Sequence, residues 1–308
     1  MKQRNRLIIL ALLCSGIFIT AGYAQQDSQF TQYMYNTETI NPAYAGTRGI
    51  PNFTGIYRNQ WVGIDGAPET FNFTANTLLR EQIGLGFNVV QDKIGPSDES
   101  TLTIDFSYIL RLTDNFNLSF GLKGGINLLN VDFTRLNIYN PTDPEFQYNI
   151  DHRLTPIIGT GIYIYNDISY FGISVPNLLE TTHFDSVTVS NASEKPNFYV
   201  IGGYVFNLNS NIKFKPALLG KFISGAPTSI DASANFLFNK KFTLGAAYRL
   251  DAAVSALAGF QISDQIMVGY TYDFDTTKLG NYNSGSHEIF LRFEIFKLLN
   301  RAVDPRFF

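Results

Sequence analysis

The chain has 308 residues, a formal net charge of −3 and a sequence pI near 5.6, and 45% of its residues are hydrophobic. This balance leaves no basic stripe of the kind that binds nucleic acid, so that class of partner is excluded. The single cysteine, Cys14, lies near the start. The rest of the chain can therefore form no disulfide, thiolate metal site or cysteine nucleophile.

Residues 1–24 have the pattern of a bacterial export signal. Its positive start contains Lys2, Arg4 and Arg6. The apolar run that follows, residues 7–19, is too short to span a membrane as a helix. Small residues at Gly22 and Ala24 fit the −3 and −1 positions of a cleavage site, so we expect a signal peptide over 1–24. A lipoprotein signal that uses Cys14 is the alternative, although the residue before it fits poorly.

Residues 49–296 form one train of segments, each roughly ten residues long, in which apolar and polar residues alternate. In Thr101–Leu112 every even position is apolar, and every odd position is polar except Ile109. The last segment alternates in the same way, with Phe290 out of pattern. A period of two places one class of side chain on each face of a strand. We predict fourteen strands, at 52–61, 70–79, 83–91, 101–112, 116–128, 155–165, 168–175, 197–207, 211–223, 228–238, 242–250, 252–261, 265–273 and 286–296.

The connections between these segments alternate in length. Short turns lie at 80–82, 113–115, 166–167, 207–210, 239–241 and 263–264. Longer links lie at 92–100, 129–154, 176–196 and 274–285. Short turns on one side and long loops on the other are typical of outer-membrane barrels. The sequence therefore predicts an all-β fold, a transmembrane antiparallel outer-membrane β-barrel of about 14 strands that is surrounded by outer-membrane lipid.

Glycines inside the predicted strands favour a barrel over a soluble β-sandwich. They include Gly84, Gly86, Gly121, Gly159 and Gly161. Such glycines weaken a sandwich strand but suit curvature in a barrel wall. An exported sandwich that binds glycans remains an alternative, because half-buried strands alternate in the same way. Charged residues on the inner faces are expected to line the lumen, namely Asp105, Arg111, Lys123, Lys213, Lys215, Lys221 and Asp231.

Residues 25–48, between the signal and the barrel, are rich in aromatic side chains. Aromatic side chains need an apolar surface to pack on, and Asn41-Pro42 and Ala45-Gly46 are turn signals. We expect a folded segment that packs into the periplasmic end of the barrel, as a plug or a periplasmic element; a disordered leader is the alternative. Its candidate interaction or plug residues are Phe30, Gln32, Tyr33, Asn41, Pro42, Tyr44 and Gly46. Residues 297–308 follow as a C-terminal tail.

Other patterns that could carry chemistry are weak. The histidines His152, His183 and His287 have no ligand spacing, so no metal site is expected. Ser284 and Ser286 lie near His287 but lack a nucleophile-elbow context, so neither an enzyme nor a bound cofactor is expected. The run from Gly121 to Gly125 lacks the spacing of a phosphate loop. Two acidic groups lack calcium-loop spacing, Asp143, Glu145 and Asp151, and Asp92, Asp98 and Glu99.

The opening of the chain resembles a known family. It reads Gln26-Asp27-Ser28-Gln29-Phe30-Thr31-Gln32-Tyr33-Met34-Tyr35-Asn36, followed by Asn41-Pro42-Ala43-Tyr44-Ala45-Gly46. These runs are similar to the QDPQFSQYM-like and NPAYAG motifs of the PorP/SprF family of type IX secretion system membrane proteins of Bacteroidetes, with Ser28 and Thr31 as departures. Further matches are Tyr57-Arg58-Asn59-Gln60-Trp61, Gly172-Ile173-Ser174-Val175-Pro176-Asn177-Leu178-Leu179 and a C-terminal motif, Pro305-Arg306-Phe307-Phe308.

The resemblance implies a non-enzymatic barrel of the bacterial outer membrane that assists type IX secretion and gliding motility. The implied roles are to help export or attach a large adhesin-type secreted substrate, and to contact periplasmic or lipoprotein components of the machinery. A diffusion channel or hydrophobic-solute transporter is the alternative from another class.

Overall fold

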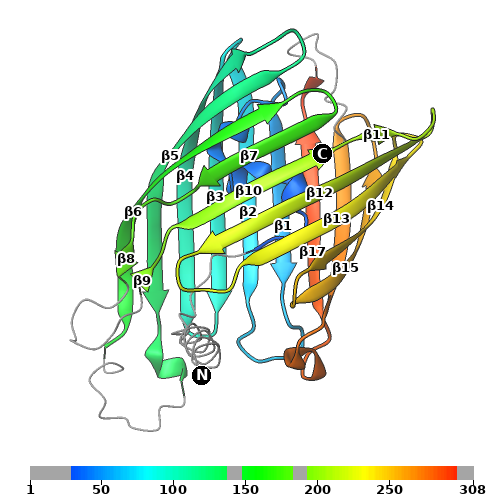
Figure 1. The fold of residues 1–308 in the computed structure, drawn as a ribbon. Helices are drawn as coiled ribbons and strands as arrows, with labels where there is room; N and C mark the ends of the chain where they lie inside the picture. The colour runs from blue at the N-terminus through cyan, green and yellow to red at the C-terminus, as the bar shows by residue number, and fades with distance from the viewer. Residues whose placement is uncertain (1–28, 137–147, 183–192, 297–308) are drawn as a thin grey trace, which may run out of the picture.

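The barrel closes completely in the computed structural model, which describes residues 29–136, 148–182 and 193–296 (Figure 1). Fourteen long strands form its wall: β1 (Asn52–Asn59), β2 (Glu69–Arg80), β3 (Ile83–Ile94), β4 (Ser97–Arg111), β5 (Asn117–Val131), β6 (Ile150–Tyr165), β7 (Ser169–Val175), β10 (Asn197–Tyr204), β12 (Ile212–Ile223), β13 (Ser229–Phe238), β14 (Phe242–Arg249), β15 (Ala253–Gln261), β16 (Ile266–Asp275) and β17 (Ser286–Glu294). The predicted fold class is confirmed.

The remaining elements are short. β11 (Phe206–Asn207) adds to the end of β12, and β8 (Thr181–Thr182) pairs with β9 (Ser193–Glu194). The 3-10 helices are η1 (Tyr33–Tyr35), η2 (Thr37–Thr39), η3 (Pro42–Tyr44), η4 (Phe133–Arg135) and η6 (Lys278–Asn281). In the described part of the chain, no helix is long and apolar enough to cross a membrane. The expected signal peptide and C-terminal tail, with its Pro305–Phe308 motif, lie outside the described residues.

Each strand pairs antiparallel with its neighbours, and two pairings complete the ring. β1 pairs with β17 from Asn52↔Glu294 to Asn59↔His287, and β10 pairs with β12 from Asn197↔Ile223 to Gly203↔Ala217. Among the described residues, each of the fourteen wall strands has a partner on both sides, although β6 pairs with β7 only from Thr160 to Tyr165. The expected long link at 92–100 is wrong, because β3 and β4 extend through it to a tight turn at Gly95, whose φ is 56°.

The two faces of each strand meet different surroundings. On β4 the even-numbered apolar residues point outward, and Ile104 is 57% exposed. The odd-numbered residues Thr103, Asp105, Ser107 and Ile109 are all buried. Ile109 thus keeps the alternation in space although it breaks the alternation in polarity. Arg111 is exposed at the end of the strand rather than inside the lumen, which corrects the expectation for that residue.

Residues 29–50, which we call the lumen segment, are the reason why the inward side chains are buried. The three helices η1, η2 and η3 lie inside the barrel (Figure 1). We name the barrel ends by their connections: the long-link end carries those of β1–β2, β5–β6, β7–β10 and β16–β17, and the short-turn end those of β2–β3, β4–β5 and β6–β7. The segment enters at the long-link end, where Gln29 contacts Ser229, and leaves beside the start of β1. The segment therefore packs inside the barrel between these two points.

Candidate functional site

The first turn of the lumen segment is held by a buried ionic cluster. Arg58 on β1 lies 2.7 Å from Asp273 on β16 and 2.9 Å from Glu288 on β17. The backbone N–H groups of Thr31 and Gln32 donate to the two carboxylate oxygens of Glu288, at 2.9 and 2.8 Å. The Thr31 hydroxyl donates to Asp273 at 2.8 Å. All five residues are buried, so each charge depends on this geometry for its compensation.

Aromatic side chains follow immediately and pack on lumen-facing apolar residues. Tyr35 stacks on Phe290 at a centroid distance of 4.5 Å. Arg292 and Lys215 lie 5.7 and 5.8 Å from the centre of the Tyr35 ring, within the range of cation–π contacts. Burial raises the pKa of Tyr35 to about 12, so the phenol is neutral at physiological pH. Phe30, Tyr33 and Met34 belong to the same buried cluster.

The middle of the lumen segment contacts the wall through short amide and hydroxyl groups. Asn36 bonds to Asn72 on β2 and accepts from the Thr74 hydroxyl at 3.0 Å. Glu38 accepts from the Asn76 amide. Burial and the charge of Asp105 raise the pKa of the Glu38 carboxyl well above its usual range, against the opposing effects of Lys123 and Asn76. This half of the segment therefore brings one carboxyl whose charged form is disfavoured.

The Asn41–Gly46 motif is seated on the opposite wall. The Asn41 amide donates to the carbonyl of Ile162 on β6 at 3.1 Å, and its oxygen accepts from the Ala43 N–H as the cap of η3. Tyr44 meets the Tyr163 ring edge-on at 5.6 Å. The Ser107 hydroxyl on β4 donates to the Ala45 carbonyl at 2.7 Å. The motif is thus held by both of its ends.

Glycines in the wall make room for this close approach. A Cβ at Gly84 would collide with the Ala45 carbonyl, one at Gly121 with the Ala43 backbone and one at Gly161 with the Asn41 side chain. A Cβ at Gly86 would collide with Glu38. The sequence suggests wall curvature as the role of these glycines, but their positions against the segment give a more direct reason. Gly159 is different, because it faces the carbonyl of Pro176 in the β7–β10 connection.

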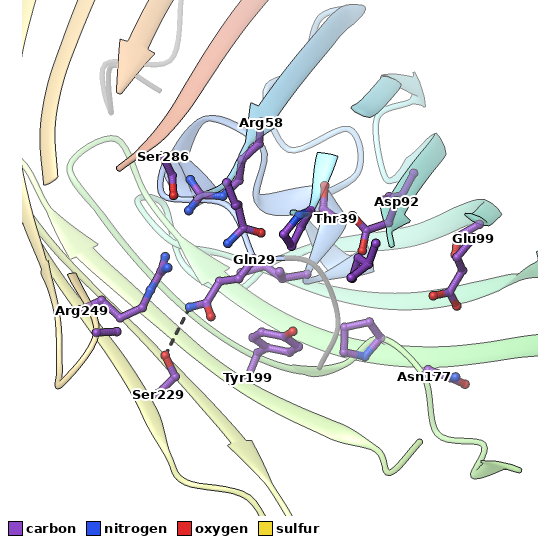
Figure 2. Close-up of a pocket in the computed structure, with 18 of the residues that line it drawn as sticks. Gln29, Thr39, Arg58, Asp92, Glu99, Asn177, Tyr199, Ser229, Arg249 and Ser286 are labelled. Carbon is purple, nitrogen blue, oxygen red and sulfur yellow. Dashed lines mark hydrogen bonds between the residues drawn. The ribbon is translucent and has the colours of Figure 1, made fainter. Parts of the chain in front are cut away.

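A cavity of about 1010 Å³ lies between the lumen segment and the long-link end of the barrel. Gln29, Thr39 and Ile40 of the segment line it together with wall residues of β1, β3, β4, β5 and β16. Figure 2 shows Gln29 between Arg249 and Ser229 on one side and Asp92 and Glu99 on the other. The Gln29 amide donates to Asp231 at 2.7 Å and to Ser229 at 3.3 Å. Most of the residues that line the cavity are polar or charged, and apolar residues such as Ile40 and Val90 lie among them.

The structure brings the seven candidate residues of the segment into one body inside the lumen. Phe30, Gln32, Tyr33, Asn41, Pro42, Tyr44 and Gly46 are all buried. Gly46 has a φ of 72°, which favours glycine, and lies against Gly84. Sequence reasoning missed the wall partners, although two of them were visible as exceptions to the alternation. Ile109 and Phe290 are apolar residues on polar faces, and both belong to the cluster around the segment.

The structure also places the histidines, the glycine run and the acidic residues that the sequence analysis considered as possible sites. The Nδ1 atom of His287 lies 2.6 Å from the Tyr270 hydroxyl, while His183 lies outside the described residues. The Gly121–Gly125 run is part of β5. Asp92 and Glu99 lie in β3 and β4 and line the cavity. Lys123 and Lys215 point inward as expected, and Lys123 lies 3.5 Å from Asp105.

Comparison with known proteins identifies the family. Among solved structures, the outer membrane protein Omp33 of Acinetobacter baumannii aligns over 80% of this chain and 100% of its own, with 9% identity and a TM-score of 0.49. The Ralstonia pickettii toluene transporter TbuX aligns over 82% of this chain and 91% of its own, with 10% identity and a TM-score of 0.49. No curated protein sequence matches significantly. The profile described as "Type IX secretion system membrane protein PorP/SprF" matches residues 22–293, so the chain belongs to the PorP/SprF family of outer-membrane barrels.

Proposed function

We propose that this protein is a closed-lumen, non-enzymatic component or accessory of the type IX secretion and gliding machinery. It would help export or attach a large adhesin-type substrate at the cell surface and contact periplasmic or lipoprotein components of the machinery. The family membership supports a place in secretion. The hypothesis that the lumen is closed depends on one observation: residues 30–50 are buried inside the barrel, except for Thr39 and Ile40.

The alternative is a diffusion channel or hydrophobic-solute transporter, which needs a continuous path for its solute. The contacts of the lumen segment argue against such a path across the occupied half of the lumen. The segment contacts β1, β16 and β17 through its first turn, and β4, β5 and β6 through η3. A channel would require many of these contacts to break together.

The experiment that separates the two functions is deletion of residues 26–46 downstream of an intact cleavage site. The deletion variant should insert and show the heat-modifiable migration of a closed barrel. In planar bilayers it should conduct steadily, whereas the full-length protein should not. In cells it should lose surface delivery of its substrate. A stable open pore in the full-length protein would instead support the channel, and normal delivery by the deletion variant would remove the functional role of the segment.

A further inference from the structure

A row of four inward-facing positions crosses the wall beside the middle of the lumen segment. In register order it contains Asn76 on β2, Gly86 on β3, Asp105 on β4 and Lys123 on β5, all of them buried. Gly86 leaves a gap in this row, and the Glu38 carboxyl of the segment occupies the gap, since a Cβ at Gly86 would collide with it. Register partners on neighbouring strands lie about 4.5–5.5 Å apart at Cα. Glu38 therefore lies between the Asn76 amide and the Asp105 carboxyl.

The charges in this row do not balance. Glu38 and Asp105 are fully buried, and Lys123 is nearly so. The Lys123 ammonium lies 3.5 Å from Oδ1 of Asp105 and donates to the Thr39 carbonyl at 3.3 Å. Strands β2 and β3 and the segment itself present uncharged groups at this point, namely Asn76, Gly86 and Ala45. Two carboxyl groups thus face the one ammonium group of the row, and a buried charge without a partner is costly.

Three carboxyl oxygens of the row also lack a hydrogen-bond donor. They are Oε1 of Glu38 and both oxygens of Asp105, which are buried without a hydrogen-bond partner among the described residues. A buried acceptor without a donor is unfavourable, whereas a protonated carboxyl brings an O–H group that can donate to a neighbouring carboxylate. Burial and the charge of Asp105 raise the pKa of the Glu38 carboxyl, against Lys123 and Asn76. One proton between the two carboxyls supplies both the missing donor and the missing positive charge.

We propose that the lumen segment, when packed on the wall, holds one proton shared by Glu38 and Asp105, and that loss of this proton as the pH rises releases residues 36–50. Two neighbouring carboxyls in a buried site retain a proton in this way. In the detached state Glu38 is solvated and gives its proton to water, while Asp105 stays paired with Lys123. The packed state thus binds one proton more than the detached state, so rising pH favours detachment. This latch goes beyond the proposed function and does not depend on it.

The test counts the shared proton through hydrogen exchange of residues 36–50 in the full-length barrel in detergent, corrected for intrinsic rates. One extra proton in the packed state changes the opening constant by at most about tenfold per pH unit. The unaltered protein should approach that slope. Glu38→Gln and Asp105→Asn should both flatten it, because each leaves a single carboxylate paired with Lys123. Lys123→Met should steepen it towards about a hundredfold per pH unit, because two carboxyls must then be neutral.

Lys93→Met is the matched control, since Lys93 and Asp98 form an exposed pair at 3.6 Å between β3 and β4. It should keep the slope of the unaltered protein. A flat slope in the unaltered protein would overturn the latch, and a slope that survives Asp105→Asn would overturn the sharing by assigning the proton to Glu38 alone. If one variant does not assemble, the remaining ones still predict opposite changes of slope. Surface delivery in cells tests the proposed function separately, because the slope is measured without a substrate.

Discussion

Residues 29–35 of the lumen segment meet the wall through charged groups and aromatic rings, whereas residues 36–50 meet it through short polar side chains and close backbone approach. In the first part, Glu288 and Asp273 bind backbone and hydroxyl donors and share Arg58 as their cation. The second part has two exceptions: Arg48 lies 2.6 Å from Glu294, and Tyr44 meets the Tyr163 ring.

This difference teaches that one segment can be attached by two kinds of interaction with different failure modes. A buried charge cluster holds only while every charge keeps its partner. A close steric fit tolerates changes of charge but not of volume. The first part is therefore expected to detach alone when a charge is removed, and the second part when a wall glycine gains a side chain.

The largest expected effect comes from Arg58→Met. It leaves Asp273 and Glu288 buried without their cation, which should cost about 3–5 kcal/mol in the attachment of residues 29–35. Hydrogen exchange should show faster opening of residues 29–35 while residues 36–50 stay protected. Arg111→Met is the control, because Arg111 and Asp114 form an exposed pair and no measurable change is expected. Equal loss of protection in both parts would contradict their independence.

Gly121→Val is expected to have a smaller effect, and to affect residues 36–50 instead of residues 29–35. Its side chain would overlap the backbone of Pro42 and Ala43, which should cost about 1–3 kcal/mol or displace the motif. Gly124→Val on the same strand is the matched control, because a Cβ there meets nothing within 4 Å. Exchange of residues 36–50 and bilayer conductance should rise only for Gly121→Val. The steric account fails if both variants behave alike.

Ser107→Ala tests the contribution of a single hydrogen bond to the attachment of residues 36–50. It removes the hydroxyl donor to the Ala45 carbonyl, at 2.7 Å, and should cost about 1 kcal/mol in the second part alone. Ser119→Ala on β5 is the control, because the Ser119 hydroxyl is buried without a hydrogen-bond partner among the described residues. The variants are compared by exchange rates of residues 42–47. A larger loss in the Ser119 variant would contradict this assignment.

The strands could be predicted from the sequence because alternation is a local property of each segment. The attachment of the lumen segment could not, since its contacts join residues far apart in the chain, such as Asn41 with Ile162 and Thr31 with Glu288. No local pattern distinguishes a glycine that curves a wall from one that faces another backbone. On the wall strands, the exceptions Ile109 and Phe290 were a local sign of an apolar body inside a polar lumen.

The last expected effect is a pH dependence of the second part, carried by Glu38. Attachment raises the pKa of this carboxyl above its ordinary value of 4.5, through burial and the charge of Asp105, against Lys123 and Asn76. The attached state thus holds a proton that the detached state releases, so its stabilisation is complete below the detached pKa and declines as pH rises through the attached pKa. The opening free energy of residues 36–50, from exchange corrected for intrinsic rates, should therefore decrease with rising pH. Glu38→Gln keeps an acceptor for Asn76 but cannot ionise, so its profile should be flatter; the same slope in both proteins would assign the pH dependence to another group.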